Sequence, residues 1–215
     1  MAVLITEQGK VQVRAPLRLS EKQIREFVEK HRAFISKTAQ ERQSAWQEKA
    51  SFSVTQGDTL LVFGREYPVR FAEKAQFTGE YFEIPKGDFE AVKGQIIKEY
   101  KRLAQEWIPK RTYELAREIG VEPLSVRVNS AKTRWGSCSG KNALNFSWRL
   151  ILADRDTIDY VIIHELCHIR HHNHSIAFWK MVEGFVPHYQ TFQQNLKHIS
   201  KRLQRENWER SANKQ

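Results

Sequence analysis

Two histidines and a glutamate stand close together in the segment His164-Glu165-Leu166-Cys167-His168. When such an H-E-x-x-H pattern lies on a helix, the two histidines are one turn apart on the same face, about 6 Å along the axis, so both can bind one metal ion. Glu165 then lies beside the metal, where it can take a proton from water and pass it to a leaving group. The pattern predicts a metal-dependent hydrolase with Zn²⁺ as the cofactor and Glu165 as the catalytic residue.

A catalytic zinc site needs a third protein ligand and one open position. Three histidines that follow the pattern could supply the ligand: His171, His172 and His174. If the helix simply continued, His172 would share a face with His164 but lie about 12 Å from it along the axis. Because zinc–nitrogen bonds are about 2.1 Å long, three ligands along one straight helix cannot close around one ion. The helix is therefore expected to end before the third ligand.

The residues after the pattern favour His174 as that third ligand. Asn173 tolerates a left-handed backbone, and Ser175 can cap a new helix over residues 176–183. A turn of this kind would return His174 to the metal from outside the first helix. The predicted ligand set is His164, His168 and His174.

The spacing of the three histidines equals that of the metzincins, but two other features of that class are missing. Their turn glycine is replaced by His171, and the nearby Met181 falls inside the predicted second helix instead of a Met-turn. Membership of the metzincins is therefore not expected. Three imidazoles would also suit nickel, cobalt or iron, so the sequence leaves the metal used in the cell open.

The predicted catalytic helix begins at Asp154, a residue type that caps helices. The segment before it, Leu144–Leu150, alternates apolar and polar residues and is predicted to be a strand, as is the segment 124–128. We expect the strand Leu144–Leu150 to lie beside the cleft, where an extended peptide could pair with its free edge.

Two longer helical patterns precede these strands. Residues 20–44 are predicted to form one amphipathic helix capped by Ser20. Residues 88–119 are also helical, with Pro109 as a kink or as the first turn of a second helix, and with Gly120 as the terminator.

Between these helices, residues 52–85 carry short apolar runs separated by glycine turns, which is typical of a β meander. The predicted fold class is α+β, with a zincin-like catalytic domain built around the H-E-x-x-H helix. The predicted divisions are a β-rich N-terminal region with one helix at 1–87, the catalytic domain at 88–206 and a C-terminal tail at 207–215.

The composition restricts the class of protein further. The 215 residues are 40% hydrophobic, carry a net charge of +10 and have a pI near 9.7, which allows an anionic partner such as a nucleotide or nucleic acid. No run approaches the 18 or so apolar residues of a membrane span, and no secretory signal is expected at the first residues. Two cysteines are too few for a disulfide framework, so a cytoplasmic location is expected. The oligomeric state is not predicted.

Four motifs resemble those of the YgjP-like metal-dependent hydrolases, which are zinc metallopeptidases related to the SprT-like and WLM-type proteases. The motifs are RWGSCS at Arg134–Ser139, NFSWRLIL at Asn145–Leu152, IDYVIIHELCH at Ile158–His168 and NHSIAFW at Asn173–Trp179. The resemblance covers roughly residues 10–199. It implies a bacterial cytoplasmic metallopeptidase, with zinc on the three histidines named above and Glu165 catalytic.

Two further places could contribute to a site. Arg134 or Ser137 could line the cleft, or the same segment could be a turn with Trp135 packed in the core, and the sequence does not choose between these. Cys138 could bind metal, but three histidines already complete a catalytic site. Tyr189 could stabilise the oxyanion of a tetrahedral intermediate, although a buried structural tyrosine is the more common case.

The sequence favours a zinc metallopeptidase that acts on a peptide or protein substrate. One alternative is a metal-dependent hydrolase of nucleotide phosphoanhydrides, which suits the positive charge but has no glycine-rich phosphate loop to support it. Another is a DNA-associated protease or binding protein, whose binding would depend steeply on salt.

Overall fold

The structure is a computed structural model that describes residues 1–208, so residues 209–215 of the predicted tail lie outside the described residues. The chain forms two compact units, residues 1–53 with 201–207 and residues 54–200 with Trp208, and each unit is described by itself. Among the helices of residues 1–208, none is both long and apolar enough to span a membrane.

The first unit consists of a β-hairpin and two helices, followed by the last turns of the C-terminal helix. Its elements are β1 (Ala2–Ile5), β2 (Val11–Arg14), α1 (Glu21–Lys30) and α2 (Arg32–Ser51). The two strands are antiparallel, with Val3 opposite Val13. The strand β1 was not predicted.

The single helix predicted over residues 20–44 is in fact two helices. Ser20 caps α1 as expected, in a capping box with Gln23. The helix ends at His31, whose ring Nδ1 lies 2.9 Å from the carbonyl oxygen of Phe27, the acceptor that its backbone N–H would use in a continuing helix. The N–H of His31 bonds the carbonyl of Val28 instead, which tightens the turn and separates α1 from α2.

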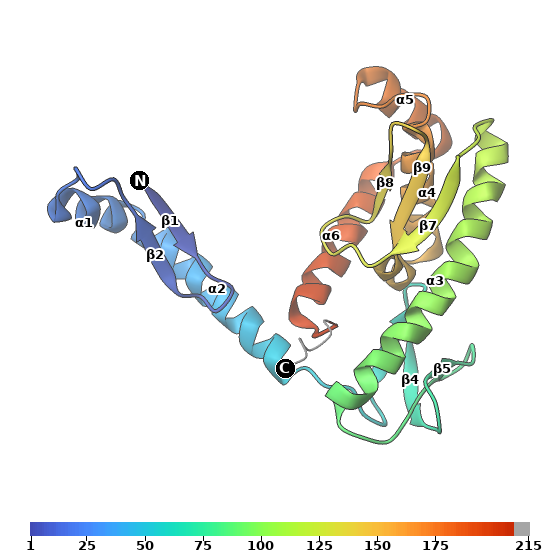
Figure 1. The fold of residues 1–215 in the computed structure, drawn as a ribbon, viewed down its shortest axis with the longest axis horizontal. Helices are drawn as coiled ribbons and strands as arrows, with labels where there is room; N and C mark the ends of the chain where they lie inside the picture. Colours follow the sequence, from blue (N-terminus) through green and yellow to red (C-terminus); the bar gives the residue numbers. More distant parts are fainter. Residues whose placement is uncertain (209–215) are drawn as a thin grey trace. The chain divides into compact units, whose positions relative to one another are not determined.

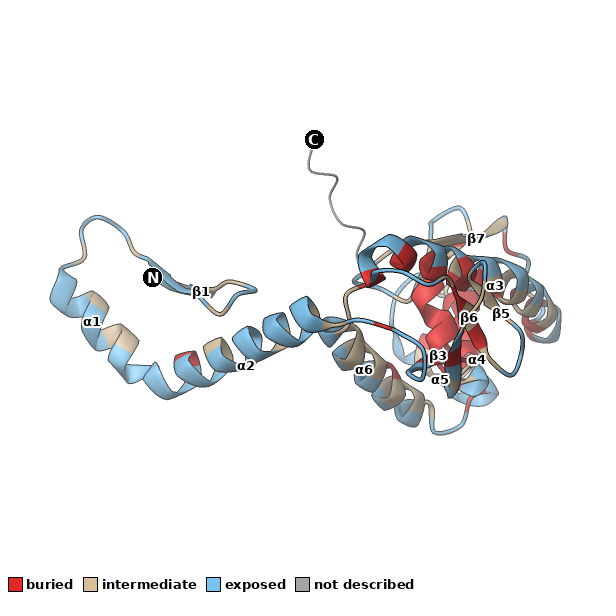
Figure 2. Ribbon diagram, turned by 90° about the horizontal axis from the view of Figure 1, so that it is seen from below, coloured by how far each residue is buried: buried red, intermediate tan, exposed pale blue. Residues whose placement is uncertain are grey.

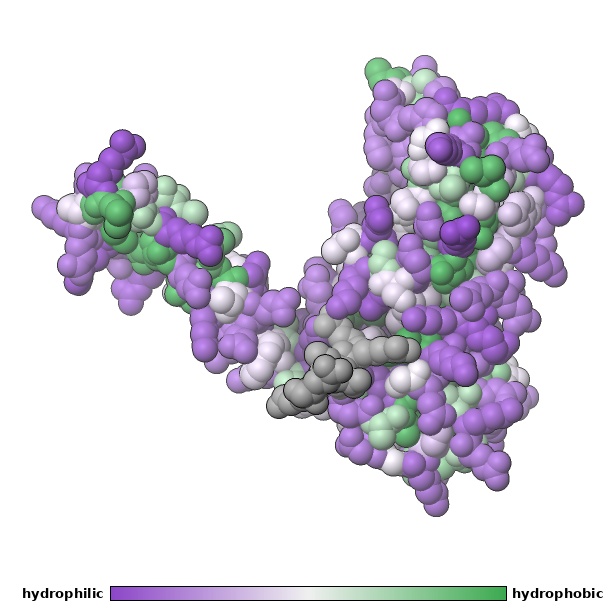
Figure 3. Space-filling view, viewed as in Figure 1, coloured by the Kyte–Doolittle hydropathy of each residue, from purple (hydrophilic) through white to green (hydrophobic). Residues whose placement is uncertain are grey.

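The first unit has little core of its own. No residue of α1 is buried, and Ile35 is the one buried residue of α2. Figure 2 shows the two helices mostly in the colour of exposed residues. Green, which marks hydrophobic residues, is visible on the surface of this unit in Figure 3. The large hydrophobic side chains that stay exposed in this unit include Leu4, Val11, Val13, Leu17, Phe34 and Trp46.

The second unit holds two sheets and four helices. Its elements are β3 (Thr59–Val62), β4 (Arg65–Phe71), β5 (Gln76–Phe77), β6 (Phe82–Ile84), α3 (Phe89–Ile119), β7 (Ser125–Asn129), β8 (Gly136–Cys138), β9 (Ala143–Ser147), the 3₁₀ helix η1 (Trp148–Leu152), α4 (Arg155–Cys167), α5 (Ile176–Phe185) and α6 (Tyr189–Arg205), of which residues 201–205 belong to the first unit. The strand orders are β3-β4-β6-β5 and β7-β9-β8. The predicted α+β class is confirmed.

The long helix α3 lies along the β7-β9-β8 sheet (Figure 1) and supplies much of the core. Asp88 caps its start, and Gly120 ends it in a left-handed conformation with φ of 73°. Pro109 lies inside this one continuous helix, so the alternative of two helices is wrong. The neighbouring Ile108 and Thr112 are fully buried. Their packing offsets the roughly 3 kcal/mol that a proline costs inside a helix.

The strand predicted at Leu144–Leu150 is wrong in its second half. β9 ends at Ser147, and residues 148–152 form the buried helix η1. The alternation that predicted a strand ran through the polar residues Asn145, Ser147 and Arg149. Arg149 is itself buried, and its guanidinium donates hydrogen bonds to the carbonyls of Ser130 and Ala131.

The turn between β3 and β4 supports the start of the predicted catalytic helix. The N–H groups of Phe63 and Gly64 donate to the carbonyls of Ile151 and Leu152 at the end of η1. Gly64 lies so close to Asp154 that an added Cβ would meet its backbone at 2.8–2.9 Å. The contacts therefore group residues 54–87 with the H-E-x-x-H helix. The domain division predicted after residue 87 stays a prediction.

Candidate metal centre

The H-E-x-x-H segment occupies the C-terminal end of α4, as predicted. Asp154 caps this helix, and its carboxylate accepts hydrogen bonds from the N–H and the hydroxyl of Thr157 at 2.9 and 2.7 Å. The helix ends at Cys167, with His168 as the C-cap, and the N–H groups of the next residues bond back to Leu166 and Cys167. The helix therefore breaks before residue 172, as the ligand geometry required.

The loop after α4 brings His174 back to the two helical histidines. Ser175 caps α5 by accepting a hydrogen bond from the N–H of Phe178, so the predicted second cap is confirmed. Asn173 is not among the described residues with a positive φ, so the loop does not use the left-handed backbone that Asn173 tolerates. The loop turns within the ordinary φ range instead.

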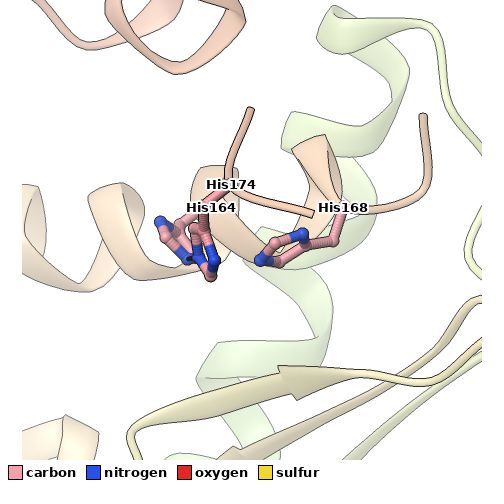
Figure 4. A group of neighbouring side chains, drawn as sticks. All are labelled: His164, His168 and His174. Carbon is pink, nitrogen blue, oxygen red and sulfur yellow. Dashed lines mark hydrogen bonds between the residues drawn. The ribbon is translucent and has the colours of Figure 1, made fainter. Parts of the chain in front are cut away.

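The three predicted ligands lie together with their imidazole rings turned toward one another (Figure 4). The ligand atoms of His164, His168 and His174 all lie within 4.8 Å of one another. The Nε2 atoms of His164 and His174 are 3.2 Å apart. In a tetrahedral zinc site with bonds of about 2.1 Å, neighbouring nitrogens are about 3.4 Å apart, so the donor set fits a tetrahedral metal.

A hydrogen bond sets which nitrogen of His168 faces the centre. Its Nδ1 lies 2.9 Å from the carbonyl oxygen of His171, which can only accept, so Nδ1 carries the proton and Nε2 keeps its lone pair. His171, one of the sequence alternatives for the third ligand, thus contributes through its backbone. Neither His171 nor His172 belongs to the group of converging ligand atoms.

Aromatic packing holds His164 in place, and among the described residues its buried Nδ1 has no hydrogen-bond partner. Its ring makes edge contacts with the rings of Tyr160, Phe178 and Trp179, with centroids 6.0, 4.9 and 5.7 Å away. Burial lowers the pKa of His164 to about 4, with the neighbouring histidines acting in the same direction. Burial also lowers the pKa of His168. Both rings are therefore neutral at pH 7, which is the form that binds metals.

Glu165 is 7% exposed and directly follows His164 on α4. Burial raises the pKa of its carboxyl to about 7, and the positive charge of Arg134 opposes that rise. A carboxyl with a pKa near neutrality can both accept and release a proton at physiological pH.

Comparison with known protein families identifies the family of this chain. The family model for the YgjP-like metallopeptidase domain matches residues 1–199. The chain belongs to the YgjP-like metallopeptidase family. The resemblance drawn from the four sequence motifs is confirmed, and the chain is a peptidase-like hydrolase of a family that uses a metal ion.

Two solved structures are similar to part of this YgjP-like chain. One is the metallopeptidase zymogen of Pyrococcus abyssi abylysin, with 22% identity and a TM-score of 0.39, covering 46% of this chain and 98% of that chain. The other is the metallopeptidase zymogen of Methanocaldococcus jannaschii jannalysin, with 23% identity and a TM-score of 0.38, covering 44% of this chain and 95% of that chain. No curated protein matches the sequence.

The strand beside the centre is β8, where β9 had been expected. In the order β7-β9-β8, the strand β9 has a neighbour on both sides, so the free edge predicted for Leu144–Leu150 does not exist. β8 is an edge strand of this sheet and packs against α4. The motif Arg134–Cys138, which the sequence left open, thus runs beside Glu165.

Arg134 and Cys138 of this motif interact electrostatically with Glu165. Arg134, which is exposed, opposes the rise in the pKa of Glu165. Burial, together with the charge of Glu165, raises the pKa of the Cys138 thiol to about 11. Trp135 is half-buried instead of packed in the core. Gly136 and Cys138 share a face of β8 because side chains alternate along a strand.

Tyr189, the residue predicted to stabilise an oxyanion, is the first residue of α6 and is half-buried. Its ring stacks on Trp179 with centroids 5.0 Å apart and on Tyr160 with centroids 6.2 Å apart. Trp179 in turn stacks on His174, with centroids 5.5 Å apart. Tyr189 therefore supports the third ligand through one intervening ring, and its oxyanion role stays a prediction.

The sequence reasoning gave no role to three aromatic residues at the centre, Trp179, Phe178 and Tyr160. Phe178 is fully buried and contacts all three histidine rings, stacking on His168 with centroids 4.4 Å apart. Tyr160 is buried, and its hydroxyl accepts a hydrogen bond from Gln193. Tyr160 lies four residues before His164, a spacing that could have indicated a shared helix face. No sequence signal distinguished Phe178, because its contacts come from a different helix.

Proposed function

We propose that this protein is a zinc-dependent peptidase in which His164, His168 and His174 hold the metal and Glu165 is the general base. The observation that carries the proposal is the convergence of three imidazole ligand atoms within 4.8 Å of one another. The buried Glu165 lies beside them, on the same helix as His164. Three nitrogen ligands with a fourth position left open are the arrangement typical of catalytic zinc.

The described residues have defined tasks in this mechanism. A bound zinc ion would supply Lewis-acid chemistry, polarising the scissile carbonyl and lowering the pKa of water. Glu165 accepts a proton from the attacking water on a carboxylate oxygen. As the carbon–nitrogen bond breaks, Glu165 delivers that proton to the leaving amine. The neutral rings of His164 and His168 leave the positive charge of the ion undiminished, which supports both steps.

The backbone of β8 offers hydrogen bonds to an extended peptide substrate. The N–H of Ser139 bonds Ala143, and the N–H of Ser147 bonds the carbonyl of Trp135, so odd-numbered residues of this segment pair with β9. In an antiparallel ladder the alternate residues, Gly136 and Cys138, point their N–H and C=O groups away from β9. A peptide adding to this edge would lie beside Glu165.

A peptide or protein substrate agrees with the family. The nucleotide and nucleic-acid alternatives and the cytoplasmic location stay predictions from the sequence. The test is cleavage of a mixed peptide library by the zinc-loaded protein, read by mass spectrometry beside Glu165→Gln. We expect cleavage by the unmodified protein and a loss of at least about 10²-fold in the variant, because general acid–base catalysis is worth 10²–10⁴-fold.

The control is the zinc content of the two proteins, measured by elemental analysis. Equal zinc content shows that Glu165→Gln lost proton transfer and not the metal. Full activity in Glu165→Gln would contradict the mechanism. No cleavage by either zinc-loaded protein would contradict the peptidase assignment, and nucleotides would be tested next.

A further inference from the structure

Gly136 is the residue of β8 that lies against the carboxylate of Glu165. A Cβ built on Gly136 would lie 2.7 Å from Cγ, 2.7 Å from Oε1 and 2.9 Å from Cδ of Glu165. Non-bonded carbon atoms prefer separations of about 3.5–4.0 Å, so no side chain larger than hydrogen fits there while Glu165 stays in place. The contact joins two residues that are 29 positions apart in the sequence.

The backbone conformation of Gly136 gives no other reason for a glycine. Gly136 is not among the described glycines with a positive φ, and it pairs with Phe146 inside the β8–β9 ladder. Glycine inside a strand costs stability because it has no side chain to pack, and it often marks a close approach of another group. Here the approaching group is the side chain of the proposed general base.

The geometry points to Gly136 as the positioning residue that sets where the carboxylate of Glu165 lies. Glu165 is 7% exposed, and its helix is fixed at both ends by the Asp154 cap and by the histidine loop. Any added side chain at position 136 must therefore displace the carboxylate, since the strand is held by its ladder to β9. The inference rests on the proposed function of Glu165.

The first test is Gly136→Ala, with Gly140→Ala as the matched control. Gly140 lies in the same β8–β9 hairpin region and has nothing within 4 Å of an added Cβ. We expect Gly136→Ala to keep its zinc content and to lower kcat about 10²-fold, with a much smaller change in KM, because a displaced catalytic group costs about that much. Gly140→Ala should behave as the unmodified protein.

The second test is independent of activity and uses thermal unfolding of the same variants in a Glu165→Ala background. Glu165→Ala removes all three atoms that the added methyl group would meet. Gly136→Ala should lower Tm by about 3 °C or more when Glu165 is present and by clearly less when residue 165 is alanine, which a double-mutant cycle measures.

The outcomes separate this inference from the proposed function. Full activity of Gly136→Ala, loss of its zinc, or the same Tm change in both backgrounds would each overturn the positioning role. If the unmodified protein cleaves no peptide, the proposed function fails. The Tm coupling then decides by itself whether Gly136 positions Glu165.

Discussion

The two compact units differ in how their helices are stabilised. In α4 nine residues are buried and in α3 thirteen, whereas α1 has none and α2 has one. The first unit relies on local interactions such as the capping box at Ser20 and the exposed ion pair between Glu21 and Arg25. Exposed ion pairs contribute at most about 1 kcal/mol. The ligand-bearing residues thus lie in the unit whose core can hold them to a fixed geometry.

This difference has a chemical reason. A metal site needs several side chains held within fractions of an ångström, and packing of buried groups supplies that rigidity. Helix caps and exposed ion pairs favour a helix locally, but a helix held by them alone can unfold locally at little cost in free energy. We therefore expect substitutions in the two units to differ strongly in effect, and the following experiments test that expectation from the largest effect to the smallest.

The largest expected effect is the loss of metal binding in His174→Ala. Loss of a residue that only hydrogen-bonds to a metal ligand lowers metal affinity by about 10–100-fold, so removing a ligand itself should lower zinc affinity by more. His171→Ala is the control, because the bond to His168 comes from the backbone carbonyl, which alanine keeps. Elemental analysis after dialysis measures the zinc content of both variants. Zinc loss in His171→Ala alone would overturn the ligand assignment.

A matched pair of isoleucines compares the two units directly. Ile162 on α4 is fully buried, and Ile24 on α1 is half-buried. Ile162→Ala should cost about 2–5 kcal/mol of the free energy of unfolding, because it leaves a cavity. Ile24→Ala should cost about 1 kcal/mol or less. Hydrogen exchange, which reports each unit separately, would contradict the comparison if the two losses were equal.

A buried carboxylate in the second unit predicts a dependence of stability on pH. Burial raises the pKa of Glu99, but hydrogen bonds from Arg102 and from the N–H of Phe77 outweigh burial, so the pKa lies below the ordinary value of 4.5. Because this pKa is lowered, the ionised carboxylate of Glu99 contributes to the free energy of unfolding above pH 4.5. This contribution is lost as the pH falls below that value.

Glu99→Gln should therefore lower the stability at pH 7, by about 1.5–3 kcal/mol, the range of hydrogen bonds to charged groups. The deficit relative to the unmodified protein should shrink as pH falls below about 4.5. Denaturant unfolding at pH 7 and pH 4 measures the two values. A deficit that is unchanged at the lower pH would show that the charge of Glu99 is not the cause.

The smallest expected effect concerns the edge of β8. Cys138→Pro removes an N–H that points away from β9, which should raise KM for peptides about tenfold, the equivalent of 1.4 kcal/mol for one lost hydrogen bond. Cys138→Ala keeps that N–H and controls for the loss of the thiol. An unchanged KM in Cys138→Pro would argue against pairing of the substrate with β8.

Local sequence signals predicted much of the centre. The caps at Ser20, Asp154 and Ser175 and the terminator at Gly120 are all present, because each depends on a side chain within a few residues of the backbone that it satisfies. The break after α4 followed from bond lengths alone, since no straight helix could close three ligands around one ion.

Other features escaped the sequence because they depend on distant contacts. The alternation through Arg149 predicted a strand, but carbonyls 18 and 19 residues away bind its guanidinium inside the protein. The edge of the sheet was assigned to the wrong strand because strand order is not a local property of any strand. Pro109 allowed a break that the core packing around α3 prevents.

By itself, the sequence indicated the family through its four motifs. Helical spacing and capping within about twenty residues predicted the three converging histidines and Glu165 as the candidate catalytic residue. The tertiary structure alone decided that β8 is the strand beside Glu165, that Phe178 contacts all three histidines, and that Gly136 leaves room for the carboxylate. These contacts join elements far apart in the chain. They exist only after the sheet and the helices have packed, and no periodicity in the sequence records them.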